Sequence, residues 1–178
     1  MNIIKFLQES GKLKTLKRAG WVKKEVKEVE SVADHTFQVT LMAYLLCPED
    51  MDKEKMIKMS LVNELPEVVT GDIITKHTDK QDFKDAKFQK EQTVIREMVS
   101  GLDNKEEIIK LYDESEALQT NESIFLKQLD KLEMAFQALE YEKQSDDMEK
   151  FNEFWDTARN TIKHPNLVEI FNELEKKR

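Results

Sequence analysis

The sequence predicts an all-α protein that forms a single domain over residues 1–178. Gly and Pro number only 4 and 3, whereas Lys, Glu, Leu and Met, which favour helices, are abundant. Apolar residues also recur at helical spacing along most of the chain. A domain of this length buries roughly 70% of the surface that its unfolded chain exposes, so one substantial core is expected.

The N-terminal part is expected to contain a short helix and a connector. Apolar residues within 3–7 mark one side of a first helix, which Gly11 interrupts before a helical spacing resumes up to Arg18. Residues 20–22, Gly-Trp-Val, are then expected to break the helix. The charged segment 23–30 is expected to form an exposed connector.

A better-marked helix follows. Residues 31–34, Ser-Val-Ala-Asp, resemble a capping box with Asp in place of the usual Glu, and Pro48 is expected to close the helix that they begin. His35 lies in the first turn of this helix. Val39, Met42 and Leu46 follow it at helical spacing, so the imidazole is expected to point toward the core.

The next helix is expected to begin after Asp52 as its N-cap and to carry residues 63–67 at its far end. Pro66 lacks a backbone N–H and should bend or end the helix there. Residues 71–72, Gly-Asp, indicate a turn. The rest of the chain predicts a polar loop at 75–81 and helices at about 83–100, 108–112, 122–143, 151–162 and 167–174.

Asp130 lies in the middle of the longest predicted helix. That helix is apolar around most of its circumference, which is typical of a central helix. Burying an isolated carboxylate costs several kcal/mol or shifts its pKa, so such a residue usually has a partner. Asp130 is therefore the first residue to indicate a functional site.

Composition excludes several classes of protein. The longest apolar run, residues 41–47, is far shorter than the roughly 20 residues that cross a bilayer, so no membrane association is expected. The N-terminus shows no secretory signal, and Cys47 alone can form no intrachain disulfide, so a cytoplasmic protein is expected. The net charge of −8 argues against binding to a nucleic acid polymer. A small phosphate ester would need a local cation, either a metal or an Arg.

Each polar residue also has an ordinary structural interpretation. A single His on an apolar stripe is more often a hydrogen-bonded core residue than a ligand. Glu64 and Glu67 would ordinarily be solvated, and helix capping could explain Asn63 and Asp72. What favours a functional site over these structural roles is the order in which His35, these residues and Asp130 follow one another along the chain.

That order resembles the HD-domain metal-dependent phosphohydrolases, in the branch that includes the 5′-deoxynucleotidases. The similarity covers nearly the whole chain in the expected order, and the motifs that carry it are residues 20–22, 30–35, 61–67, 70–72, 126–130, 138–142 and 164–165. The resemblance implies an HD-domain helical bundle that hydrolyses nucleoside 5′-monophosphates with a divalent metal ion. It also implies a homodimer.

Carried over residue by residue, the resemblance assigns three sets of roles. The metal-ligand positions are His35, Asn63, Glu64 and Asp130; the carboxylate that assists proton transfer is Glu67; the substrate-binding residues are Arg18 for the phosphate, Trp21 for the pocket and Asp72 near the sugar. In this chemistry a divalent ion neutralises phosphoryl charge and lowers the pKa of bound water toward about 7.

The pair that gives the family its name, His then Asp, is Asn63-Glu64 in this chain. The ligand set then becomes one nitrogen and three oxygens, which favours Mg²⁺ or Mn²⁺ over Co²⁺ or Zn²⁺. The side chain of Glu64 is one methylene longer than Asp, which compensates for Asn63 extending less far toward the ion than a His would. Three interpretations remain: an active phosphohydrolase, a protein that binds nucleotides without turnover, and a helical scaffold.

Overall fold

In the computed structural model, which describes residues 2–75 and 80–178, the chain is helical as predicted. Within these residues the only β-type pairing is one isolated antiparallel bridge between Lys17 and Ser31. No helix of the described chain is both long and apolar enough to cross a membrane. The α-helices are α1 Ile3–Ser10, α2 Ala19–Lys23, α3 Val32–Leu46, α4 Lys53–Asn63, α5 Glu67–Thr70, α6 Gln81–Val99, α7 Lys105–Ala117, α8 Asn121–Glu142, α9 Asn152–Thr161 and α10 Pro165–Glu175, and the 3₁₀ helices are η1 Gly11–Lys14 and η2 Glu149–Phe151.

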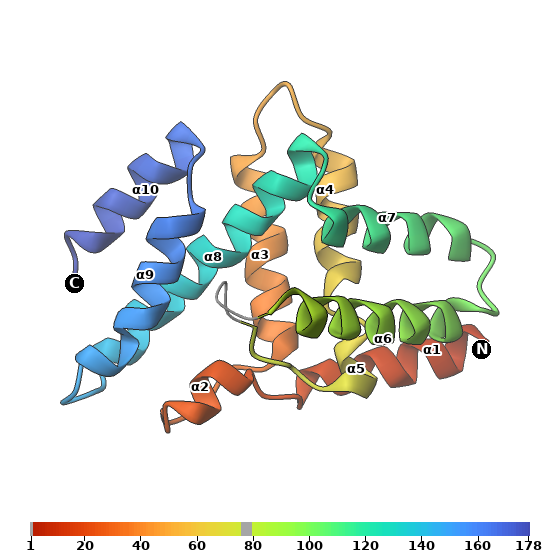
Figure 1. Cartoon of the computed structure of the whole chain (residues 1–178), viewed down its shortest axis with the longest axis horizontal. Helices are drawn as coiled ribbons and strands as arrows, with labels where there is room; N and C mark the ends of the chain where they lie inside the picture. Colours follow the sequence, from red (N-terminus) through yellow and green to blue (C-terminus); the bar gives the residue numbers. More distant parts are fainter. Residues whose placement is uncertain (1, 76–79) are drawn as a thin grey trace.

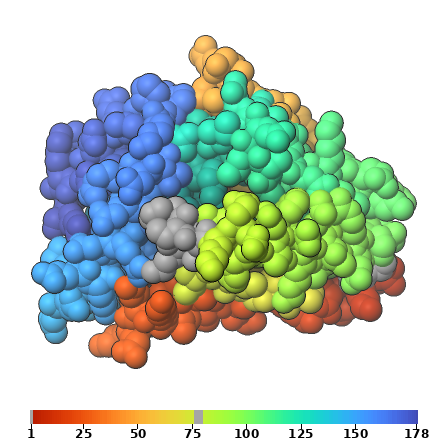
Figure 2. Space-filling model, in the orientation of Figure 1, coloured from red at the N-terminus to blue at the C-terminus, as the bar shows by residue number. Residues whose placement is uncertain are grey.

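Helix α8 is the centre of the bundle, as its apolar circumference predicts. It packs against α3, α4, α7, α9 and α10, and α6 covers α7 (Figure 1). Leu129, Leu132, Ala135 and Ala138 of α8 are fully buried. Figure 2 shows one face of the molecule, with α6 and α7 over one half and α9 and α10 over the other. Residues from distant parts of the sequence therefore meet around α8.

The predicted helix starts of α3 and α4 are confirmed at the level of their caps. The Ser31 hydroxyl accepts a hydrogen bond from the backbone N–H of Asp34, and the Asp34 carboxylate accepts one from the backbone N–H of Ser31. The Asp52 carboxylate accepts one from the backbone N–H of Lys55 at 2.9 Å. These caps satisfy donors that have no partner inside the helix, and the cap of α3 fixes where His35 enters the core.

The far end of α4 also follows the prediction. The helix ends at Asn63, and the chain turns through residues 64–66 before the short helix α5. Pro66 is the N-cap of α5, where its missing N–H costs nothing. Gly71 ends α5 with a φ of +77°, a conformation that residues with a Cβ rarely adopt. This break leaves Asn63, Glu64 and Glu67 at a turn between two helices.

Two predictions about the N-terminal part were wrong. The helical spacing up to Arg18 yields only the 3₁₀ turn η1, because residues 16–18 pair with residues 30–32 through the bridge. Gly20 does not break a helix but lies inside α2. A Cβ at Gly20 would lie 3.3 Å from the ring of Phe154, so the glycine permits close packing of α2.

The predicted loop at 75–81 falls mostly on 76–79, outside the described residues, and Gln81 already belongs to α6.

Candidate active site

His35 lies between two carboxylates of the central helix. Its Nε2 atom is 3.1 Å from Asp130 Oδ1, and its Nδ1 atom is 2.5 Å from Glu133 Oε2. The imidazole is 1% exposed. Burial and the nearby Arg18 lower its pKa, but the two carboxylates outweigh them and raise the pKa of His35 to about 10. Helix α8 therefore provides a partner for each ring nitrogen from residues one turn apart.

Asp130 remains ionised although it lies in the middle of a central helix. Burial alone would raise the pKa of this carboxyl, but Lys131 at 2.8 Å and Lys127 at 3.6 Å lower it well below its usual value. The hydrogen bond with His35 acts in the same direction. The partner that the sequence required for Asp130 thus comes from α3 and from the neighbouring Lys residues of α8.

Asn63 and Glu64 join His35 and Asp130 around one cavity. The Asn63 amide donates a hydrogen bond to Glu64 Oε1 at 2.9 Å. The cavity measures about 50 Å³ to the centres of the water molecules that could fill it, and Lys127 lines it together with the four predicted metal ligands. The structure thus brings all four predicted ligand positions together, from α3, the end of α4, and α8.

Glu67 and Glu64 are neighbouring carboxylates with opposite pKa shifts. Glu67 is 4% exposed, and burial together with the charges of Glu64 and Asp72 raises its pKa to about 11. Burial would also raise the pKa of Glu64, but His35 and Arg18 lower it below the usual value. Glu64 is therefore suited to hold a cation, and Glu67 to carry a proton.

One oxygen of Glu67, Oε2, is buried and has no hydrogen-bond partner among the residues that the structure describes. An unsatisfied buried oxygen is costly, and it usually indicates strain, a catalytic role or a ligand. The orphaned oxygen of Glu67 lies on the turn that also carries Asn63 and Glu64.

Arg18 and Asp72 form a second pair beside the cavity. Arg18 Nη1 is 3.7 Å from Asp72 Oδ2, and the same oxygen accepts a hydrogen bond from the backbone N–H of Ala19 at 2.7 Å. Burial would lower the pKa of Arg18, but Asp72, Glu64, Asp130 and Glu67 together raise it. Asp72 therefore has a structural role, holding the start of α2, besides any role toward a substrate.

Trp21 lies in the core rather than in the cavity lining. The indole is 2% exposed and contacts the rings of Tyr141, Phe151 and Phe154. Its Nε1–H donates a hydrogen bond to Glu30 Oε1 at 2.7 Å. The substrate-binding role of Trp21 stays a prediction, and what the structure adds is this contact with Glu30.

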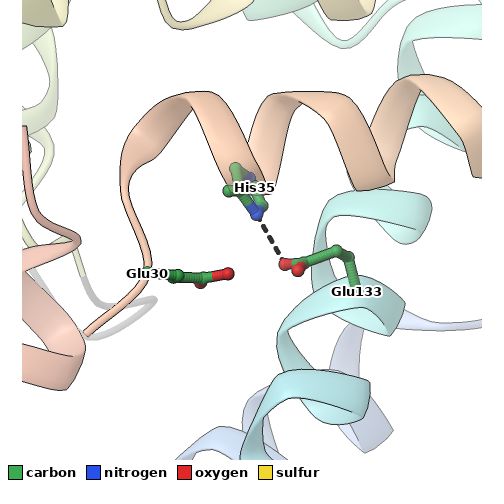
Figure 3. A group of neighbouring side chains, drawn as sticks. All are labelled: Glu30, His35 and Glu133. Atoms are coloured by element: carbon green, nitrogen blue, oxygen red, sulfur yellow. Dashed lines mark hydrogen bonds and ion pairs between the residues drawn. The ribbon is translucent and has the colours of Figure 1, made fainter. Parts of the chain in front are cut away.

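Two carboxylates next to His35 were missed from the sequence. Glu30, His35 and Glu133 each offer an atom within 4.8 Å of the others, a spacing that could hold a metal ion (Figure 3). Glu133 follows Asp130 by three residues on an apolar helix, so helical periodicity alone could have placed both carboxylates on one face. Glu30 gave no such signal, because only the fold of the connector brings it to His35.

The donor set around the cavity fits a hard divalent cation. It offers one imidazole nitrogen from His35, one amide oxygen from Asn63, and the carboxylates of Glu64 and Asp130, whose pKa values are both lowered. Ionised carboxylates and amide oxygens are the ligands that Mg²⁺ and Mn²⁺ prefer. The two carboxylates lie beside a cavity that can admit water or a phosphoryl oxygen.

Comparison with known proteins identifies the family of this chain. A family model described as HD domain matches residues 10–171. The 5′-deoxynucleotidase HDDC2 of Dictyostelium discoideum is 39% identical and that of Bos taurus 31%, over 99% of this chain and 98% and 86% of theirs. The crystal structure of the PH0347 protein from Pyrococcus horikoshii superposes with a TM-score of 0.79 at 28% identity, over 99% of this chain and all of the other. This chain therefore belongs to the HD-domain family.

Proposed function

We propose that this protein is a metal-dependent phosphohydrolase that releases phosphate from deoxynucleoside 5′-monophosphates. The observation that carries the proposal is the cavity lined by His35, Asn63, Glu64 and Asp130, together with the buried carboxyl of Glu67 on the turn that also carries Glu64. The similarity to proteins named 5′-deoxynucleotidase, over almost the full length of both chains, supports the substrate class.

The residues around the cavity suit a phosphate monoester. When bound at the four ligand positions, a divalent ion would neutralise phosphoryl charge and lower the pKa of water. Arg18 supplies a fixed positive charge next to the cavity, and its salt bridge with Asp72 keeps the guanidinium in place. The cavity is much smaller than the several hundred Å³ of a typical ligand pocket, so it accommodates the phosphoryl end while the nucleoside extends outward.

Glu67 supplies the proton that the leaving group needs. Water adds to phosphorus as the bond between phosphorus and the 5′-oxygen breaks, the departing 5′-oxygen takes the proton of Glu67, and the proton that the water releases returns to the Glu67 carboxylate. Glu67 holds a proton because burial and two neighbouring carboxylates raise its pKa to about 11. It therefore acts as the general acid in this proposal. Asp72 is held by Ala19 and Arg18. In this proposal it would lie near the sugar and disfavour a ribose 2′-hydroxyl.

A screen of metals against nucleotides tests the proposed function. Chelator-treated protein is supplied with Mg²⁺, Mn²⁺, Co²⁺ or Zn²⁺, and phosphate release is measured from deoxy- and ribonucleoside 5′-monophosphates. We expect release with Mg²⁺ or Mn²⁺, faster from the deoxynucleotides. Tight binding of nucleotide without phosphate release under any metal would instead identify a nucleotide-binding protein. Neither binding nor release would leave the HD-domain fold as a scaffold.

The outer face of α3 supports a homodimer. Phe37, Tyr44 and Leu45 are 67%, 57% and 64% exposed, and with Leu41 they form one apolar stripe at helical spacing. Exposed apolar stripes of this kind are typical of interfaces between protein chains, and C₂ dimers are the commonest soluble oligomers. This stripe is the surface at which two copies of the chain would meet.

Light scattering tests this dimer. We expect the unaltered chain to show twice the chain mass of 21.0 kDa at micromolar concentration, because burying the stripe removes apolar surface from water. The double substitution Phe37→Glu with Leu45→Glu should yield the monomer. Met148→Glu is the control, since Met148 is also exposed, at 40%, but lies between α8 and η2 rather than on the stripe of α3. A monomeric unaltered chain would contradict the proposal.

A further inference from the structure

The contact between His35 and Glu133 is not used by the reaction described above. Glu133 is 2% exposed, and its Oε2 atom lies 2.5 Å from His35 Nδ1 (Figure 3). The other ring nitrogen, Nε2, faces Asp130. His35 lines the cavity together with Asp130, whereas Glu133 does not. The two ring nitrogens of His35 therefore have different surroundings: Nε2 lies toward the cavity, and Nδ1 lies toward Glu133.

The distance to Glu133 is that of a hydrogen bond and not of two ligands sharing an ion. Ligands at adjacent octahedral positions around Mg²⁺ lie about 3.0 Å apart, because each is about 2.1 Å from the ion. His35 Nδ1 and Glu133 Oε2 are closer than that. In addition, Glu30, the third member of this group, already accepts the hydrogen bond of the Trp21 indole. An ion between these three residues would have to displace both contacts.

We propose that Glu133 is the positioning residue of the metal centre: it accepts the Nδ1 proton of His35 and thereby presents Nε2 to the ion. A histidine ligand whose other nitrogen donates to a carboxylate keeps one tautomer and one ring orientation, and it binds the metal more strongly. Glu133 can do this because it lies one helical turn from Asp130 on α8, so one rigid helix fixes both the ligand and the partner of His35. This inference rests on the proposed metal site.

The connector that carries Glu30 is held in place beside Glu133. Glu30 lies on the connector that leads into α3, and its backbone N–H donates a hydrogen bond to the Tyr141 hydroxyl of α8 at 2.8 Å. Trp21, packed against Tyr141 at a ring distance of 5.2 Å, holds the Glu30 side chain. The connector is thus tied to α8 on the same side of His35 as Glu133. Glu133 itself is 2% exposed, and a buried side chain of a central helix can fix the orientation of the ring.

The test is the substitution Glu133→Gln, which keeps the size of the side chain but removes its charge. Calorimetry with Mn²⁺ alone should show binding that is about 10- to 100-fold weaker than that of the unaltered chain. Glu142→Gln is the matched control: Glu142 is a buried carboxylate of the same helix, 4% exposed, that accepts a hydrogen bond from Trp155. Its substitution should leave Mn²⁺ affinity unchanged. Glu133→Asp, which keeps the charge, should recover part of the affinity.

Nitrogen NMR of the imidazoles gives a second, independent measurement. In the Mg²⁺-loaded unaltered chain we expect a proton on His35 Nδ1 and a metal-shifted resonance for Nε2, assigned through a His35→Gln variant. Unchanged Mn²⁺ affinity in Glu133→Gln, a metal-shifted Nδ1, or no metal binding by the unaltered chain would overturn the proposal. The proposed hydrolysis fails separately: Mn²⁺ bound with the Glu133 effect intact, but no phosphate released, would overturn only that function.

Discussion

Replacing Glu67 by Gln is expected to lower kcat for phosphate release by roughly 10²- to 10⁴-fold, the usual contribution of a general acid. Gln keeps the shape of the side chain but holds no proton that it can give to the 5′-oxygen. Because that proton transfer belongs to the transition state, the Kd for a deoxynucleoside 5′-monophosphate should change little. Steady-state kinetics with Mn²⁺ and equilibrium nucleotide binding measure the two quantities. Activity within threefold of the unaltered chain would remove Glu67 from the mechanism.

The substitution Glu67→Gln should also change how the stability of the folded chain depends on pH. Burial and the adjacent carboxylates raise the pKa of Glu67 from 4.5 to about 11, so between these values the unfolded chain releases a proton that the folded chain keeps. Its contribution to the free energy of unfolding is full below pH 4.5 and is lost as the pH rises. Gln does not titrate. In metal-free protein we therefore compare the difference in Tm, Glu67→Gln minus the unaltered chain, at two pH values. This difference should be larger at pH 8 than at pH 5 by at least about 3 °C, which corresponds to about 1 kcal/mol in the free energy of unfolding.

Restoring the family pair, by Asn63→His together with Glu64→Asp, is expected to shift metal preference toward Co²⁺ and Zn²⁺. The imidazole replaces a neutral amide oxygen with a nitrogen donor, and transition metals prefer nitrogen more than Mg²⁺ does. We expect the ratio of Zn²⁺ to Mg²⁺ affinity to rise by roughly 10- to 100-fold, on the order of 1.4–2.8 kcal/mol. Competition calorimetry on chelator-treated protein measures this ratio. The change also tests whether the pair contributes ligands at all.

Asp130→Asn is the companion variant for this experiment. It removes the carboxylate that faces His35 Nε2 at 3.1 Å, and it leaves Lys127 and Lys131 next to a neutral group. Metal binding should then fall below detection in both the unaltered and the restored background. An unchanged metal ratio in the restored pair, with Asp130→Asn still abolishing binding, would mean that Asn63 and Glu64 line the cavity without coordinating the ion. Phosphate release that appeared only in the restored pair, together with tight nucleotide binding by the unaltered chain, would identify the unaltered chain as a nucleotide-binding protein.

Local chemistry determined most of the helices and their ends. The reciprocal hydrogen bonds of Ser31 and Asp34, and the cap formed by Asp52, involve residues three apart, so sequence spacing alone specifies them. The apolar circumference of α8 likewise predicted a central helix, and Asp130 within it predicted a partnered carboxylate. The family resemblance then named four ligand positions that the fold brings around one cavity.

The tertiary structure decided what depends on distant segments. The pKa of Glu67 is raised mainly by burial, and this burial depends on α6 and η1, which pack against α5 from other parts of the chain. Gly20 lies inside α2, where a Cβ would approach the ring of Phe154, far along the chain, to 3.3 Å. Glu133 contacts His35 only because α3 and α8 cross at these residues, a separation of 98 positions. Spacing rules reach one or two helical turns, whereas burial and charge depend on every segment that folding brings near, and this is why the sequence determined the helices and the structure determined the environment of the site.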